Sequence, residues 1–340
     1  MSLHVAVVGA TGAVGETILR VLEERSIPID RLSPFASRDR AGAVRFRERQ
    51  LDVRAVDPVA LQGHDVVFFA GGEDASDRYA AKLIELGAVV IDNSATFRMR
   101  SDVPLVVPEI NGDAIRREHR LLPVANCTAI VLCAALAPVR DVAGLHGMHA
   151  STYQAASGAG RAGLDEFLAD ERSLVLGGDE PPATVFPRPL ARNVIPQVGA
   201  FDATGYSGEE RKVREETRKI LGLPELRASL TCVRVPVRTA HSAAVWFETE
   251  RKTTLDELAA AFDRAPGIVF HRDGIVTPRE VEGSDDVHVA RLRAESDHEF
   301  VLWCIGDQLR KGAATNAVQI LELLIAKGYL SLQHAPGAAR

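Results

Sequence analysis

The sequence has few cysteines and no long apolar run. Its 340 residues include four cysteines, and no two of them have Cys-x-x-Cys spacing. So few cysteines in so long a chain indicate reduced thiols rather than a disulfide framework, and their spacing argues against structural zinc. We therefore expect no metal site. The longest apolar stretches are about a dozen residues, too short for a membrane-spanning helix.

The chain also lacks a block of Lys and Arg, and its net charge is −6 at pH 7. This acidic balance argues against nucleic acid or an anionic membrane as the main partner. The first residues, MSLHVAVV, enter a strand pattern at once and lack the layout of a secretory signal. We therefore expect a cytoplasmic enzyme, and the chain length suits two domains.

The first half has the pattern of a dinucleotide-binding fold. HVAVV (residues 4–8) reads as a buried strand, GATGAVG (9–15) follows directly, and apolar residues at helical spacing come next. Glycines let the backbone approach a pyrophosphate, and a helix N-terminus supplies free N–H groups and positive partial charge. The spacing is Gly-x-x-Gly-x-x-Gly, so a tight turn without a nucleotide is the alternative.

Polar residues after the second strand candidate, RLSPFAS (31–37), bear on the choice of cofactor. An NAD enzyme usually has an acidic residue there for the ribose 2′-hydroxyl. Here Ser37 and Arg38 are followed by Asp39 and Arg40, and a hydroxyl beside guanidinium groups suits a 2′-phosphate. This favours NADP, although Asp39 weakens the argument and a solvated charged loop is the alternative.

Two further segments, HDVVFFAGG (64–72) and AVVIDNSA (88–95), are the next parallel-strand candidates. Each ends in small or polar residues, and open α/β sheets bind ligands at the carboxyl ends of their strands. We therefore expect Gly71 and Gly72 to touch the cofactor.

The second half has a different texture. Residues 177–199 are rich in proline and predict a long irregular segment. The strand candidates around it are HGMHASTYQAAS, ELRASLTCVRVPV and SAAVWFETE, with the helix pattern GEERKVREETRKILG between the first two. These elements predict an α+β domain whose sheet could also bury a dimer face. KGAATNAVQILELLIAKGYL (311–330) predicts a strongly amphipathic closing helix, and the last ten residues, 331–340, a frayed tail.

The predicted fold class is therefore α/β, with an N-terminal Rossmann-like dinucleotide-binding domain and a second α+β catalytic and dimerisation domain. We place the NADP-binding domain at 1–126, completed by the helix at 311–330. The substrate, catalytic and dimerisation domain then spans 127–310.

Cys127 lies in ANCTAI, between the strand-like LLPVA and the helix-like IVLCAALAPV. That position seats its sulfur at a helix N-terminus, where the dipole favours a thiolate. The alternative is an inert core cysteine, which is the interpretation we give to Cys133 and Cys304. Candidate partners for a nucleophile are Gln154 in STYQAASGAG, Arg234 in CVRVPV, and His241, placed on a turn between two strands where it could act as a base.

Together these motifs resemble the aspartate-β-semialdehyde dehydrogenase family along essentially the whole chain. The matching segments are VVGATGAVG, NSATFRMRSDVPLVVPEIN, NCTAI, STYQAASGAG, NVIPQVGAF, EETRKIL, CVRVPVRTAHSAAV and GDQLRKGAATNAVQI. The resemblance implies reduction of β-aspartyl phosphate by NADPH to aspartate semialdehyde and phosphate, in lysine, threonine, methionine and diaminopimelate synthesis. It also implies a homodimer or a dimer of dimers.

The resemblance assigns catalytic roles by motif. Cys127 would form the acyl-enzyme thioester, and His241 would act as acid/base, keeping the thiol ionised and shuttling a proton. Gln154 would orient the substrate, Arg234 would grip its carboxylate, and Glu216 would face its ammonium. Arginine suits the carboxylate because its planar fork donates two parallel hydrogen bonds.

Phosphate and cofactor contacts follow from the same motifs. The implied phosphate-recognition residues are Arg98, Asn126 and Lys219. The cofactor-binding residues that we expect are Gly9, Thr11, Gly12, Ala13, Val14, Ser37, Arg38, Gly71, Ser157, Gly158 and Gln308. Glu216 and Lys219 are three apart on a helix, so both can face one cavity, with an exposed ion pair as the alternative. Arg98 could instead be a surface residue beside Arg100.

The sequence departs from the family near the nucleophile. The family commonly has Asn-Pro-Asn-Cys-Ser/Thr-Thr, where this chain has Ala125 for the proline and Ala129 for the last hydroxyl residue. Neither change removes a reacting group.

Two rival functions follow from the same residues. N-acetylglutamyl-phosphate reductase uses the same thioester chemistry, but its substrate hides the amine, so Glu216 favours the free amino acid. A scaffold that has lost catalysis should lack Cys127, His241 or Arg234, and all three are present.

Overall fold

The computed structural model describes residues 2–37, 42–179 and 181–330. Arg38, with Asp39 and Arg40, and the tail 331–340 lie outside the described residues, so the predictions made for them have no structural counterpart. The chain forms two compact units, one running up to Ala125 and resuming at Ala313, the other Asn126–Gly312. Within the described part, no helix is both long enough and apolar enough to cross a membrane.

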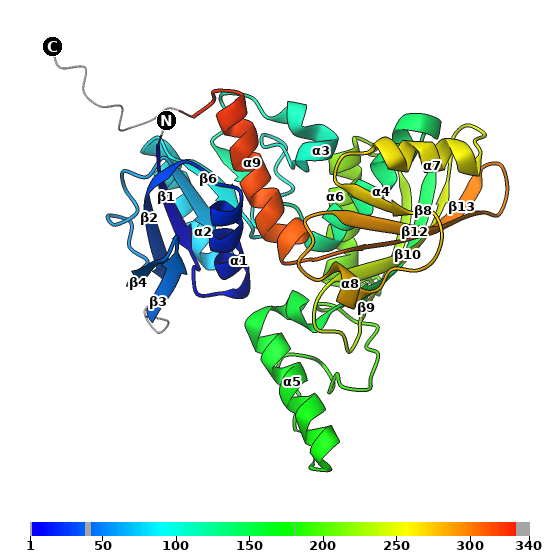
Figure 1. Cartoon of the computed structure of the whole chain (residues 1–340), viewed down its shortest axis with the longest axis horizontal. Helices are drawn as coiled ribbons and strands as arrows, with labels where there is room; N and C mark the ends of the chain where they lie inside the picture. The colour runs from blue at the N-terminus through cyan, green and yellow to red at the C-terminus, as the bar shows by residue number, and fades with distance from the viewer. Residues whose placement is uncertain (1, 38–41, 180, 331–340) are drawn as a thin grey trace. The chain divides into compact units, whose positions relative to one another are not determined.

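The first unit is built on a seven-stranded sheet in the order β3-β4-β2-β1-β5-β6-β7 (Figure 1). All neighbouring strands are parallel except the β3–β4 hairpin. The strands are β1 Leu3–Val8, β2 Ile29–Ala36, β3 Gly42–Phe46, β4 Arg49–Ala55, β5 Val66–Phe69, β6 Val89–Asp92 and β7 Leu121–Pro123. The four strands predicted in this half are present as β1, β2, β5 and β6.

Helices cover both faces of this sheet. Right-handed crossovers place α1 (Ala13–Glu24), between β1 and β2, on the face opposite α2 (Glu73–Glu85), between β5 and β6. Ala80 and Leu83 of α2 pack with Ala6 and Val8 of β1 in one buried cluster. Strands β5 and β6 are buried at every position, as expected for central parallel strands.

The last helix, α9 (Thr315–Ala326), belongs to the first unit although it comes last in the chain. It packs against α1, β6 and the short α3 (Pro108–Asn111). The guanidinium of Arg25, just after α1, donates two 2.9 Å hydrogen bonds to the carboxylate of Glu322 on α9.

The prediction of one amphipathic helix over 311–330 was wrong in two respects. A π-helical turn, Arg310–Ala314, precedes α9, and the helix ends at Ala326. Every residue from 311 to 318 is buried, including the polar Lys311, Thr315 and Asn316, so this stretch packs on all sides. A helix buried all round has no polar face, and the exposed face appears only in its last turns.

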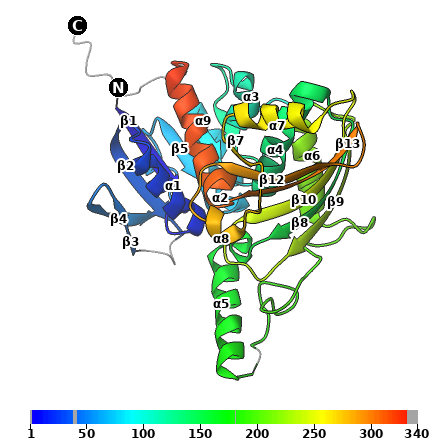
Figure 2. The ribbon, with the colours of Figure 1, turned by 45° about the vertical axis from the view of Figure 1, so that its right-hand side comes forward.

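The second unit contains a six-stranded mixed sheet in the order β11-β12-β13-β10-β8-β9 (Figure 2). The pairs β8–β9 and β11–β12 are parallel and the others antiparallel. Its strands are β8 Gly147–Gln154, β9 Arg227–Arg234, β10 His241–Glu248, β11 Ile268–His271, β12 Val287–Ala294 and β13 Glu299–Gly306. Three of these, β8, β9 and β10, coincide with the predicted strands.

Three helices, α4 (Cys127–Ala143), α6 (Gly208–Leu221) and α7 (Leu255–Arg264), pack on one face of this sheet. The α4 helix lies between the other two and contacts β10, β12 and β13. This mixed sheet with helices on one face matches the predicted α+β domain.

A separate small cluster holds α5 (Gly160–Leu176) against the irregular segment predicted at 177–199. The Glu166 carboxylate accepts the backbone N–H groups of Thr184, Val185 and Phe186, which ties this segment to the helix. The remaining helix, α8 (Pro278–Val281), contacts β13.

Candidate active site

Four neighbouring strands of the second unit, β13, β10, β8 and β9, have chain ends that lie next to one another at one end of the sheet. Gln154 and Arg234 end the parallel strands β8 and β9 and pair directly with each other. His241 begins β10, which runs antiparallel to β8, and pairs with Gly306 at the end of β13. Along their strands these residues share a face with the buried side chains of Thr152, Cys232 and Ala243, which is the face that α4 and α6 cover. The sheet thus brings Gln154, Arg234 and His241 together.

His241 was predicted on a turn between two strands, and this was wrong. It is the first residue of β10, and the turn ends one residue earlier, at Ala240. Ladder pairing with β8 and β13 on both sides extends the strand up to the histidine.

Cys127 is the first residue of α4, as predicted from the sequence. The side-chain oxygen of Asn126 caps this helix by accepting the N–H groups of Thr128 at 2.9 Å and Ala129 at 3.2 Å. Asn126 is therefore a helix cap as well as a predicted phosphate contact, and its capping fixes where the helix that carries Cys127 begins.

Cys127 also differs from the other cysteines in burial. It is partly exposed, whereas Cys133, Cys232 and Cys304 are buried. Burial raises the pKa of each of these three thiols to about 12. They remain protonated at neutral pH and belong to the core, which agrees with the interpretation of Cys133 and Cys304.

The π-helical turn passes very close to Cys127. A Cβ atom added to Gly312 would lie 2.7 Å from the Cβ of Cys127 and 3.4 Å from the Cβ of Gln308. Real Cβ atoms do not approach this closely, so the position requires glycine.

His241 is 1% exposed, and its two ring nitrogens have different surroundings. Nδ1 accepts the backbone N–H of Ala155 at 3.1 Å, whereas Nε2 has no hydrogen-bond partner among the described residues. A nitrogen that accepts a hydrogen bond carries no proton, so the neutral ring is protonated on Nε2. Burial, followed by the charge of Arg234, lowers the pKa of His241 to about 3.

Arg234 is a buried cation without an ion-pair partner in the described part of the chain. One guanidinium nitrogen donates to the carbonyl of Ala155 at 2.7 Å, and the group lies 5.8 Å from the ring centre of Phe186. Burial lowers the pKa of Arg234, and the largest opposing influence is the charge of Glu209. The guanidinium can therefore still pair with a carboxylate.

Gly158 lies directly beside these two groups. A Cβ added there would be 2.7 Å from Nη1 of Arg234 and 2.8 Å from Nε2 of His241. Its lack of a side chain keeps space next to the orphan nitrogen of the histidine.

Gln308 and Ser157 connect three loops around the histidine. The Gln308 side-chain oxygen accepts the N–H of Ala240 at 2.7 Å, and its amide nitrogen donates to the Ser157 hydroxyl. That hydroxyl donates to the carbonyl of Arg238 at 2.5 Å. Gln308 and Ser157 thus hold the loops around the histidine together. Their contact with a nicotinamide stays a prediction.

Glu216 and Lys219 lie on α6. Glu216 is 1% exposed, and its carboxylate accepts the N–H of Asn126 at 2.5 Å, whereas Lys219 is half-buried. Burial of Glu216 contradicts the alternative of an exposed ion pair on the helix surface.

The glycine motif of the first unit has the shape expected of a phosphate-binding turn. Gly9 has φ +85°, and a Cβ there would lie 2.7 Å from the backbone nitrogen of Gly71. A Cβ on Gly15 would lie 2.1 Å from the carbonyl oxygen of Gly9. The turn runs through Thr11 to Gly12, the N-cap of α1, and Ala13 and Val14 form the first helical positions. The loops after β1 and β5 therefore adjoin at an open helix N-terminus, and Ser37 follows β2 at the same end of the sheet.

Arg98 follows β6 in the first unit and is 8% exposed. Its guanidinium donates to the carbonyl of Asn93 at 2.8 Å. The alternative of a surface residue beside Arg100 is therefore wrong.

One residue of this region, Glu209, is missing from the sequence prediction. Its carboxylate accepts from the side-chain amides of Asn126 and Gln154. The sequence signals only its neighbour, because Ser207 and Glu210 form a capping box.

Two family models match the chain: semialdehyde dehydrogenase, NAD binding domain, over residues 4–118, and semialdehyde dehydrogenase, dimerisation domain, over 136–311. Aspartate-semialdehyde dehydrogenase of Aquifex aeolicus is 38% identical and covers 97% of this chain and 100% of its own length. The Synechocystis enzyme of the same name is 40% identical, covering 96% and 99%.

Solved structures give the same result. The crystal structure of aspartate semialdehyde dehydrogenase II from Vibrio cholerae superimposes with a TM-score of 0.93 at 38% identity, over 96% of this chain and 99% of that one. The same match holds for the Vibrio cholerae protein complexed with ASA. The resemblance seen in the motifs is confirmed, and the chain belongs to the aspartate-semialdehyde dehydrogenase family.

Proposed function

We propose that this protein reduces β-aspartyl phosphate to aspartate semialdehyde and phosphate with NADPH, as a step in the synthesis of lysine, threonine, methionine and diaminopimelate. Membership of the family supports this, as do relatives of that name and the ASA complex of the Vibrio cholerae protein. Family membership makes the N-acetylglutamyl-phosphate and scaffold alternatives the weaker ones.

The observation that carries the proposal is a buried, unpaired cation, Arg234, beside the ring of His241. Arg234 is 6% exposed, has no ion-pair partner among the described residues, and shares Gly158 as a neighbour with the orphan Nε2 of His241. A buried charge without a partner is costly. A site that binds an anionic substrate compensates this cost when the substrate carboxylate arrives.

The glycine turn of the first unit fits a dinucleotide pyrophosphate. The close approach of Gly9 and Gly71 leaves backbone N–H groups at the start of α1 uncovered by side chains. We propose that this turn, from Gly9 to Val14 with Gly71, holds the pyrophosphate of NADPH. The other cofactor contacts expected from the sequence, Ser37, Arg38, Ser157, Gly158 and Gln308, stay predictions. When bound, NADPH supplies the hydride of the reaction.

The residues of the second unit then divide the chemistry. The Cys127 thiolate attacks the acyl carbon, a C–S bond forms, and the C–O bond to phosphate breaks. Phosphate leaves with the bonding electrons and takes up a proton from solvent. After reduction of the thioester, the C–S bond of the thiohemiacetal breaks, which releases the aldehyde and restores the thiolate.

His241 is suited to act as a hydrogen-bond donor in these reaction steps. Its Nε2–H, held in place by the Ala155 N–H on Nδ1, can donate to the oxygen that becomes negative in each tetrahedral species. Because thiolate enters and thiolate leaves, the ring need not take a proton from the sulfur. We propose this donor role for His241, and the acid/base role that the sequence resemblance implies stays a prediction.

Recognition of the substrate is assigned to the remaining residues. Arg234 holds the carboxylate, Glu216 faces the ammonium, and Gln154 orients the acyl group. The phosphate group is held by Arg98, Asn126 and Lys219.

We also propose a homodimer formed through the sheet face opposite α4, α6 and α7. His149 packs on Trp246 there at 5.1 Å, and Tyr153 on Trp303 at 5.5 Å. A second copy can cover these rings. Trp246→Glu should yield monomers in sedimentation velocity, and unchanged dimers would contradict this assignment.

The activity is tested by following NADPH formation from aspartate semialdehyde, phosphate and NADP, repeated with NAD. Turnover with aspartate semialdehyde and none with N-acetylglutamate semialdehyde is expected. Cys127→Ala should abolish turnover and leave cofactor binding intact. Wild-type protein that turns over neither substrate would refute the function.

A further inference from the structure

Glu209, in the first turn of α6, links the residue that precedes the nucleophile to the end of β8. Its Oε1 accepts from the side-chain amide of Asn126 at 3.0 Å and from that of Gln154 at 3.4 Å. Asn126 caps the helix that begins with Cys127, and Gln154 ends β8. One carboxylate oxygen therefore connects the cap of the helix that carries Cys127 to the end of β8.

These contacts fix which end of each amide faces α6. Because a carboxylate only accepts hydrogen bonds, it selects the nitrogen ends of both amides. Asn126 then keeps its oxygen for the N–H groups of Thr128 and Ala129 at the start of α4. Gln154 is 1% exposed, and its nitrogen also donates to Thr152 at 3.3 Å.

The charge of Glu209 also acts on the substrate-binding arginine. Burial lowers the pKa of Arg234, and Glu209 is the strongest of the charges that counteract this effect. The two groups form no ion pair, so Glu209 supports the charge of Arg234 without occupying its fork.

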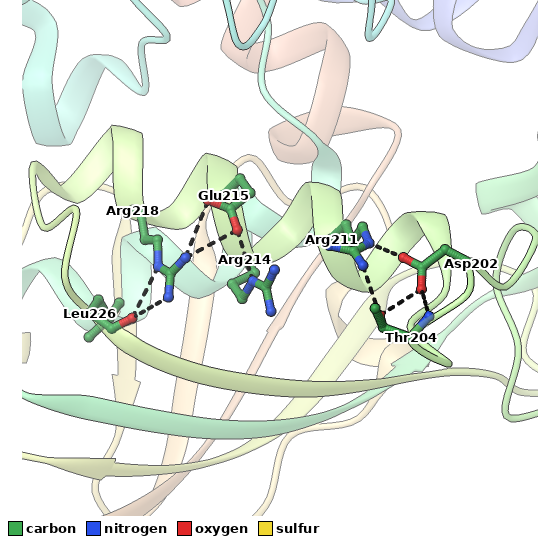
Figure 3. A network of polar contacts seen from close by, with 7 residues as sticks. All are labelled: Asp202, Thr204, Arg211, Arg214, Glu215, Arg218 and Leu226. Atoms are coloured by element: carbon green, nitrogen blue, oxygen red, sulfur yellow. Dashed lines mark hydrogen bonds and ion pairs between the residues drawn. The ribbon is translucent and has the colours of Figure 1, made fainter.

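The helix that carries Glu209 is anchored at several points. A capping box of Ser207 and Glu210 fixes its first turn, and the Glu210 carboxylate also accepts the N–H of Cys232 on β9 at 2.9 Å. On the outer side, Figure 3 shows Arg211 bonded to Asp202 and Thr204. These contacts fix the first turn of α6, which carries Glu209, and tie it to β9.

We propose that Glu209 is a positioning residue for the reaction: it orients the amides of Asn126 and Gln154 around Cys127 and balances the charge of Arg234. This inference rests on the proposed function. The proposal predicts that loss of the Glu209 charge lowers kcat without raising KM. The reason is that Glu209 contacts the amides of Asn126 and Gln154, whereas its negative charge repels the substrate carboxylate.

The test compares Glu209→Gln with wild type. The amide keeps the size of the side chain and one acceptor oxygen but loses the charge, so the two hydrogen bonds are no longer charge-assisted and Arg234 loses its strongest neighbouring negative charge. We expect kcat to fall at least tenfold, with a KM for aspartate semialdehyde that is unchanged or lower because Arg234 is less neutralised. A merely structural defect would raise KM and lower the melting temperature together.

The matched control is Glu215→Gln on the same helix. Glu215 forms ion pairs with Arg214 and Arg218 on the outer side of the helix, as Figure 3 shows. Glu215→Gln should therefore leave kcat and KM within twofold of their wild-type values. Glu209→Asp keeps the charge with a shorter reach and should recover part of kcat. If Glu209→Gln fails to fold, Glu209→Asp is the decisive variant, with a kcat at least threefold below wild type expected at unchanged KM.

The outcomes separate the two proposals. Inactive wild-type protein would refute the function itself. Active wild type with a Glu209 variant that matches it, or with a KM that rises as kcat falls, would refute only the positioning role.

Discussion

The Nδ1 atom of His241 accepts the backbone N–H of Ala155, and this contact determines which ring nitrogen can donate. Ala155 follows the last residue of β8, and His241 begins the neighbouring strand β10. The sheet ladder therefore sets the tautomer of the histidine, and the chemistry of the site depends on backbone geometry.

The first prediction concerns His241. Its terminal amide lets His241→Gln supply an N–H in place of Nε2, so this variant should retain more kcat than His241→Ala. The alanine variant should lose about 10²–10³-fold in kcat, the usual effect of removing an oxyanion donor. Steady-state kinetics on the two variants measure the difference.

The same ring predicts a pH dependence. Its pKa of about 3 in the folded protein means that His241 stays neutral throughout the range from pH 5 to 8 that is usually assayed. The profiles of kcat/KM for wild type and His241→Gln should therefore have the same acid limb. An acid limb near pH 6–7 that disappears in the variant would show that the imidazole titrates as a base.

Substitution of Arg234 should affect mainly substrate binding. Arg234→Leu removes a charge-assisted contact worth about 1.5–3 kcal/mol, so KM for aspartate semialdehyde should rise about 10- to 150-fold. Arg234→Lys should lie between, because an ammonium keeps the charge and loses the two-pronged geometry. Initial rates over a range of substrate concentrations give both values, and an unchanged KM would rule out carboxylate binding here.

Gly312→Ala should displace Cys127, because the new side chain would overlap it. The added methyl would clash with Cys127, and overpacking of this kind costs about 1–3 kcal/mol. We expect a lower melting temperature and an altered rate of iodoacetamide labelling at Cys127. Gly42→Ala is the control, since its Cβ would meet nothing within 4 Å. Equal behaviour of the two variants would contradict the close approach.

The buried thiols predict a loss of stability at alkaline pH. In the folded protein the pKa of the Cys304 thiol is about 12, whereas an unfolded thiol ionises near its ordinary value. Between these values the unfolded state binds fewer protons, so stability falls as pH rises, by up to about 1.4 kcal/mol per pH unit for each thiol. The free energy of unfolding, measured with urea at a series of pH values from 8 to 10.5, should fall less steeply with pH for Cys304→Ala than for wild type. Parallel slopes would mean that the thiol ionises equally in both states.

Local signals account for what the sequence could predict. A strand, the GATGAVG turn and a helix follow one another within 24 residues, so their geometry depends on neighbours in the chain. The position of Cys127 at a helix start was likewise readable from the two apolar runs around it.

What could not be predicted depends on distant partners. Glu209 meets Gln154 across 55 positions of sequence, and neither residue carries a local mark of that contact. The extent of β10 up to His241 depends on pairing with β8 and β13, and the π-helical turn on packing against Cys127. Tertiary contacts, rather than local propensity, determine these features.

The return of the chain to the first unit at Ala313 constrains the order of biogenesis. As the protein leaves the ribosome, β1 to β7 emerge early, yet α9, which packs on α1 and β6, is synthesised last. The second unit is complete before the first and can fold while its predecessor waits with an uncovered apolar surface. A nonsense mutation shortly before Thr315 would thus leave a finished catalytic half attached to a nucleotide-binding half that exposes its core to chaperones and proteases.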